Sequence, residues 1–218
     1  MYLKKITVVV IVGIIASFSM RAFGTIFPQV FKSLYMVKAT ILVNTIFIIV
    51  HLLFWLTFYK EYASFKNALF KKTCILAIIG SAAVSLLYIK KLPFVFDSAV
   101  SIPAFLLNPY TDAFVPLMSS FLHLVFFIVF KKSIEAEEKE MLDKPILSII
   151  VGISFFLCFH MIVLFNFIAT NQFKWLEHMP RAIAVGTLPV LVIAVVLILI
   201  FYYRFYYFLD SYFNRKTT

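Results

Sequence analysis

Three histidines lie within long apolar stretches of the sequence, where ionisable side chains are costly and usually have a function. His51 and His123 each lie nine residues before a lysine, Lys60 and Lys132 respectively. If both stretches are helices that run in the same direction, the two imidazoles lie at one depth, about 13 Å from the lysines. Two imidazoles facing each other at one depth are the axial ligands that a membrane haem b requires. The spacing therefore predicts His51 and His123 as iron ligands of a haem b.

Other interpretations of these histidines stay open. A metal or quinone site would also use imidazoles, whereas a histidine between transmembrane helices often only hydrogen-bonds to a neighbouring helix. His160 is predicted to lie about 9 Å deeper than the pair, so it would serve a second cofactor site or bond to a polar neighbour. No catalytic residues are predicted, because the sequence contains no CxxC, HExxH, GxSxG or Walker pattern.

The elements that carry these histidines are apolar segments long enough to cross a membrane. Of the 218 residues, 63% are hydrophobic and 14% are charged, whereas a soluble domain is about 45–50% apolar and about 25% charged. A spanning helix needs about 20 apolar residues. The sequence therefore predicts an all-α integral membrane protein, a single transmembrane domain over residues 1–218. Its six-transmembrane-helix bundle would use segments at about 6–20, 39–59, 73–89, 114–130, 146–169 and 182–208.

The segments between these helices differ on the two sides. On the side opposite the termini, residues 21–38, 92–113 and 170–181 are predicted to lie in the membrane interface. For residues 92–113 the alternative is a re-entrant loop buried in protein. On the side of the termini, the charged stretch 131–144 has Lys–Glu pairs four residues apart, which indicates a solvated extension of the fourth helix. Pro145 is then predicted to begin the fifth helix.

The basic residues predict the orientation of the chain. Most of the 20 Lys and Arg residues lie on the side of the termini, and the positive-inside rule therefore places both termini in the cytoplasm. The net charge of +10 comes from short clusters at the membrane surface. It therefore predicts anionic lipid at the cytoplasmic rim as a partner, and no nucleic acid. The predicted location is the cell inner or plasma membrane, as a multi-pass protein.

A spacing of 72 residues is consistent with three helical hairpins. Lys60, Lys132 and Arg204 follow the second, fourth and sixth apolar segments at this interval, and the ten residues that end in Lys60 align without gaps with the ten that end in Lys132. Gly80 and Gly152 keep the same offset. The alternative is the general tendency of an inward-running helix to end in aromatic residues and then a cation.

The acidic residues exclude some function classes. None of the ten Asp and Glu residues lies within the six predicted segments, which argues against a carboxylate-based proton relay or a cation-coupled transporter. The main prediction is an integral membrane subunit of a larger membrane complex, whose partners are other membrane subunits. Electron transfer through a haem b held by His51 and His123 is a second possibility. The alternative is a small permease or channel for an apolar or anionic solute.

Overall fold

The computed structural model describes residues 2–27, 34–97, 109–170 and 181–217, and within these ranges the chain is helical almost throughout and contains no strand. All six long helices are long and apolar enough to cross a membrane. The prediction of an all-α chain with six candidate membrane-spanning helices is therefore confirmed. The long helices are α1 (Tyr2–Ile26), α3 (Leu34–Glu61), α4 (Ala68–Ile89), α6 (Pro109–Ser133), α7 (Ala136–Thr170) and α9 (Arg181–Thr217).

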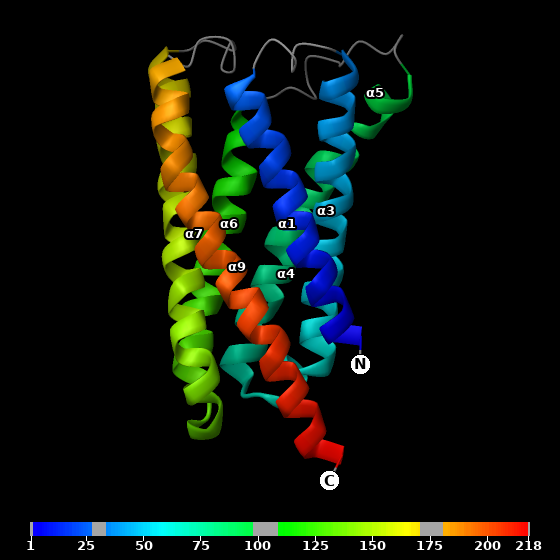
Figure 1. The fold of residues 1–218 in the computed structure, drawn as a ribbon, viewed down its shortest axis with the longest axis vertical. Coiled ribbons are helices and arrows are strands. Elements are labelled where there is room, and N and C mark those ends of the chain that lie inside the picture. The colour runs from blue at the N-terminus through cyan, green and yellow to red at the C-terminus, as the bar shows by residue number, and fades with distance from the viewer. Residues whose placement is uncertain (1, 28–33, 98–108, 171–180, 218) are drawn as a thin grey trace.

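The six helices alternate in direction and form a closed ring. Each long helix packs along the next one in the chain, and α1 also packs along α9 (Figure 1). The ring therefore consists of three antiparallel hairpins, α1–α3, α4–α6 and α7–α9. Both termini lie at the same end of the bundle (Figure 1). We call it the inner end, after the predicted orientation, and the opposite end the outer end; the cellular side of each end and the 72-residue repeat stay predictions.

The predicted interfacial segments belong partly to the long helices. The described residues of 21–38 belong to the last turns of α1, which ends at Ile26, and to the start of α3, apart from Phe27. Of 92–113, the first residues form the short helix α5 (Leu92–Phe96) and the last form the first turn of α6, where Pro109 fits because the first helical N–H needs no partner in the helix. The other parts of these segments, residues 28–33, 98–108 and 171–180, lie outside the described residues.

The charged stretch after α6 belongs to the fifth helix, so the prediction that it extends the fourth helix is wrong. α6 ends at Ser133, and α7 begins nine residues before Pro145. The carboxylate of Glu138 accepts the backbone N–H of Glu135 at 3.0 Å, which is one half of a capping box at the start of α7. This cap starts the helix early, although Pro145 cannot donate to the helical hydrogen-bond ladder.

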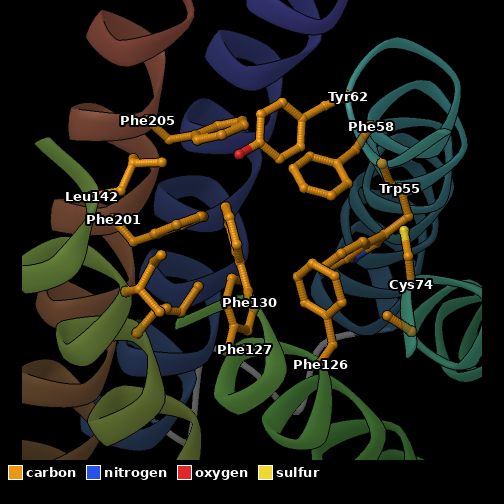
Figure 2. Packing of buried hydrophobic residues seen from close by; sticks show 14 of the residues in the cluster. Trp55, Phe58, Tyr62, Cys74, Phe126, Phe127, Phe130, Leu142, Phe201 and Phe205 are labelled. Atoms are coloured by element: carbon orange, nitrogen blue, oxygen red, sulfur yellow. The ribbon is translucent and has the colours of Figure 1, made fainter. Parts of the chain in front are cut away.

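Aromatic side chains fill the inner half of the ring. Trp55 and Phe126, for example, meet edge to face with ring centroids 4.8 Å apart and planes at 85°, a geometry that aromatic quadrupoles favour. Figure 2 shows rings from α3, α6 and α9 converging in this way. We call the cluster the aromatic plug. It consists of ten residues that are almost completely buried, namely Phe54, Trp55, Phe58, Tyr62, Phe70, Phe126, Phe127, Phe130, Phe201 and Phe205.

The outer half of the ring is packed with smaller and more polar side chains. Ser17 of α1, Asn44 and Thr45 of α3, Ser85 of α4 and Ser119 of α6 are buried. A side chain added at Gly80 would bring its Cβ within 3.2 Å of the Cα of Ser119, so α4 and α6 approach closely there. Such small-residue contacts are typical of helices that associate in membranes.

The outer parts of α7 and α9 stand apart from this packing. Among the side chains that the structure describes, none is buried between residues 154 and 170 of α7 or between 186 and 193 of α9. Both stretches are apolar, with large exposed side chains such as Phe155 and Phe165. The α7–α9 hairpin therefore contributes to the core through its inner part.

Candidate functional site

The structure brings His51 and His123 together in the interior of the ring. His51 lies on α3 and His123 on α6. Their ring centroids are 5.4 Å apart, and the ring planes are tilted by 31°. α3 and α6 are not adjacent along the chain, so this contact crosses the centre of the bundle. His160 lies on α7, where its ring is close to those of Phe156 and Phe159 on the same helix.

Two serines hold the ring of His123. Its Nδ1 lies 2.6 Å from the carbonyl oxygen of Ser119, one turn earlier on α6. A carbonyl oxygen only accepts, so Nδ1 carries the proton. In the neutral imidazole, Nε2 is then the acceptor, and it lies 3.1 Å from the hydroxyl oxygen of Ser81 on α4. The Ser81 hydroxyl therefore donates to Nε2. The tautomer of His123 is set by the Ser81 hydroxyl of α4 together with the Ser119 carbonyl of α6.

His51 accepts hydrogen bonds from two aromatic residues. The indole N–H of Trp55, one turn further along α3, donates to Nε2 of His51 at 3.2 Å. An indole nitrogen is only a donor, so this Nε2 is unprotonated. The hydroxyl of Tyr202 on α9 lies 3.2 Å from the same nitrogen and is the second donor. We call Ser81, His123, His51, Trp55 and Tyr202 the histidine cluster; it joins α3, α4, α6 and α9.

The histidine cluster marks the boundary between the two halves of the interior. On the inner side, Trp55 is itself part of the aromatic plug. On the outer side, the hydroxyl of Ser85 donates to the carbonyl of Ser81 at 2.8 Å, one turn further out on α4. The interior therefore changes from aromatic to polar within about one helical turn.

Two side chains buried in the outer half each have an oxygen without a hydrogen-bond partner within the described part of the chain. They are Ser17, through its hydroxyl oxygen, and Asn44, through its amide oxygen. Gly13 of α1 packs against Phe47 of α3, and the same antiparallel register places Ser17 level with Val43 and Asn44. An unsatisfied buried polar group costs about 1–3 kcal/mol. The seam between α1 and α3 therefore contains two buried acceptors, Ser17 and Asn44, that no described residue satisfies.

A buried ion pair closes the inner end beneath the plug. The hydroxyl of Tyr62 donates to Oε1 of Glu138 at 2.8 Å. The ammonium of Lys66 lies 2.9 Å from the same oxygen and 2.7 Å from Oε1 of Glu135. Burial lowers the pKa of Lys66, but the two carboxylates outweigh it and raise the pKa above the ordinary value of 10.5. These contacts tie the end of α3 to the start of α7.

The arrangement of the two histidines does not fit a haem b. Each Nε2, the nitrogen that would face the iron, accepts a hydrogen bond from a protein side chain. The two rings also lie against each other, whereas bis-histidine ligation needs the planar porphyrin between them. Among the described residues, no group of three or more His, Cys, Asp or Glu is placed to hold a metal ion.

Ser81 and His123 are arranged like a nucleophile and its base, and a third group orients the base. The orienting group is the carbonyl of Ser119. Ser81 is only 2% exposed, however, so a substrate cannot approach its oxygen in this conformation. The pair therefore acts here as a contact between α4 and α6.

No known protein family, curated protein or solved structure shows significant similarity to this chain. We therefore infer its function from the geometry of its interior.

The sequence does not reveal the partners of the two histidines. Trp55 could have been found from its spacing, because it lies four residues after His51 on the same helix. Ser81 and Tyr202 are distant in sequence and are of residue types common in this chain. Only the packing of α4 and α9 against the interior brings them to the site.

Proposed function

We propose that this chain is a small permease or channel, in which the polar outer half admits a solute and the aromatic plug is the closed gate. The observation that supports this function is the change in the interior at the histidine cluster. The oxygens of Ser17 and Asn44, which have no partner among the described residues, both lie on the outer side. Buried hydroxyls on the inner side, such as those of Thr7 and Thr73, bond to carbonyls of their own helices.

The chemistry of the interior favours a small anionic or neutral polar solute. The groups near mid-bundle are hydroxyls, an amide and imidazoles, which bind without supplying a negative charge. Carboxylates lie near the helix ends, as Asp112 and Glu138 do, whereas cation channels use rings of them along the path. The polar lining is less suited to the apolar solute that the sequence alone also allows.

Opening of the gate requires the helices around the plug to move. Pro116 lies within the outer half of α6 and Pro189 within that of α9. Each removes one hydrogen bond from its helix and is a preferred point of bending. A bend there would let the inner parts of α6 and α9, which carry plug residues such as Phe126 and Phe201, swing relative to their outer parts.

The test is flux through liposomes that contain only the purified chain. We would follow formate, glycerol and potassium ions as probes, with protein-free liposomes as the reference. We expect flux of formate or glycerol and none of potassium. Phe126→Ala, which opens the plug, should raise the flux, whereas Phe121→Ala on the exposed face of the same helix should not. The proposal would be contradicted if neither the unaltered chain nor Phe126→Ala transported formate or glycerol faster than protein-free liposomes do.

A second candidate function, a subunit of a larger membrane complex, is favoured by the outer parts of α7 and α9. None of the side chains described in these parts is buried. Cys158 of α7 is exposed there, whereas Cys74 of α4 is buried. A membrane-permeant thiol crosslinker applied to native membranes should then join Cys158 to a neighbour and give a product of one defined mass. Cys158→Ser should remove it. Absence of such a product from the unaltered chain would count against this function.

A further inference from the structure

An open groove runs between α1 and α3 on the outside of the ring. Its volume is about 450 Å³, and its lining includes Tyr2, Lys5, Ile6 and Val9 of α1 and Val50 and Leu53 of α3. Tyr2 and Lys5 lie in the first turn of α1, at the inner end of the bundle. The other four side chains continue toward the middle of the membrane. The groove is therefore cationic at the membrane surface and apolar within the bilayer.

We propose that this groove binds an anionic phospholipid, with one acyl chain along the apolar part and the phosphate at Lys5. Lys5 is exposed, and within the described residues it forms no ion pair, whereas its neighbour Lys4 pairs with Asp210. Lys60 is also exposed and lies on the same face of α3 as Leu53, one turn beyond Thr57. Two lysines thus flank the position that a lipid headgroup would occupy.

The acidic side chain at the end of α3, Glu61, is bound to the backbone of α1 and not to these lysines. Oxygens of the Glu61 carboxylate accept the backbone N–H groups of Tyr2 at 3.3 Å and Leu3 at 3.1 Å. Because these N–H groups lie at the N-terminus of α1, they have no acceptor within the helix, and a negative charge there is stabilised by the helix dipole. Glu61 is therefore used in capping α1, and Lys5 stays available for an external phosphate.

This lipid site is independent of the proposed transport function. Its lining faces the bilayer and shares no residue with the histidine cluster. It specifies where on the rim of the protein an anionic lipid would bind, beyond the general attraction of basic clusters for such lipids.

The experiment is native mass spectrometry of the detergent-purified full chain, titrated with dioleoylphosphatidylglycerol or with dioleoylphosphatidylcholine. We expect the first phosphatidylglycerol to bind more tightly than phosphatidylcholine. Lys5→Gln should weaken it about fivefold. Lys72→Gln is the matched control, because Lys72 is exposed at the same end but lies on α4, and it should change the affinity less than about twofold.

A second variant tests the apolar part of the groove. Val9 is half-exposed, so Val9→Trp can fill the groove without disturbing the core, and it should weaken the binding of both lipids. Equal effects of Lys5→Gln and Lys72→Gln would overturn the role of the phosphate contact. Unchanged binding in Val9→Trp would overturn the acyl-chain site.

Discussion

The inner half of this bundle holds all six helices together, whereas the outer half packs α1, α3, α4 and α6 through different interactions. The inner half uses interlocking aromatic rings and the ion pair of Lys66 with Glu138. The outer half uses close backbone approach and hydroxyl groups, and among the described residues the oxygens of Ser17 and Asn44 have no partners. Helices in lipid associate through packing and hydrogen bonds and not through a hydrophobic force. We therefore expect stability to be concentrated in the inner half and, under the proposed function, solute binding to be concentrated in the outer half.

The largest expected effect is the loss of a ring from the aromatic plug. Phe126 is completely buried and contacts Trp55, Phe58, Phe70 and Phe130. Phe126→Ala leaves a cavity among rigid rings and should lower the free energy of unfolding by about 3–5 kcal/mol. The measurement is reversible unfolding of the purified protein in sodium dodecyl sulfate.

The control for this prediction lies on the same helix. Phe121 is 47% exposed and faces the lipid, so Phe121→Ala should change the free energy of unfolding by less than about 1 kcal/mol. Similar losses in the two variants would show that the inner half is not the specifically packed region.

The next effect concerns the buried ion pair at the inner end. Glu138→Gln leaves the ammonium of Lys66 with only the exposed carboxylate of Glu135, and removing one partner of a buried pair costs up to about 3 kcal/mol. Glu140→Gln, an exposed position on the same helix, should change the stability by less than about 0.5 kcal/mol. Thermal unfolding at pH 7 in detergent compares the two; equal melting temperatures would contradict the prediction.

The same pair predicts a dependence on alkaline pH. The folded-state pKa of Lys66 is raised above 10.5, so its stabilising contribution is complete below pH 10.5 and is lost as the pH rises through the folded-state pKa. The difference in melting temperature between the unaltered chain and Lys66→Met should therefore be constant from pH 7 to pH 10. It should shrink above about pH 10.5. A difference that already falls between pH 7 and pH 9 would assign the stabilisation to another group.

The sequence predicts the helices well and their ends poorly. Apolar length marks the six spans, but the helices continue into charged residues, which hydropathy does not report. The start of α7 depends on the hydrogen bond from the backbone N–H of Glu135 to the carboxylate of Glu138. From the sequence alone, Pro145 is expected to start the helix instead, because proline is typical of the first turn of a helix. Gly80 and Gly152 share the 72-residue offset, and both prove to lie where their helix approaches the next one. A Cβ added at these glycines would come within 3.2 Å and 2.8 Å, respectively, of backbone atoms of that helix.

The candidate site was predictable only in part. Equal spacing to Lys60 and Lys132 identifies His51 and His123 as a pair at one depth, and the structure places them in contact. Spacing cannot show which way a ring nitrogen points. The hydrogen bonds from Ser81 and Trp55, which occupy both Nε2 atoms, arise from helix rotation and packing.

A smaller effect is expected at the boundary between the halves. Ser81→Ala and His123→Phe each break the bond between α4 and α6, and a double-mutant cycle should give a coupling energy of about 1 kcal/mol, within the range found for hydrogen bonds between membrane helices. The matched cycle is Ser85→Ala with His123→Phe, because the Ser85 hydroxyl bonds to carbonyls and not to the ring. Coupling of equal size in the two cycles would show that the Ser81–His123 bond has no specific contribution.

The smallest change in stability, and one of opposite sign, is expected in the outer half. Asn44→Leu removes a buried oxygen that no described residue satisfies, so it should leave the free energy of unfolding unchanged or raise it by up to about 1 kcal/mol. It should also lower the solute flux, because the same oxygen is proposed to bind the solute. Thr45→Val is the control: the hydroxyl of Thr45 already bonds to the carbonyl of Ile41 at 2.7 Å, so its loss should not affect flux. A destabilised Asn44→Leu variant would mean that the amide has a structural partner, and the predicted difference in polar satisfaction between the outer and inner halves would then be wrong.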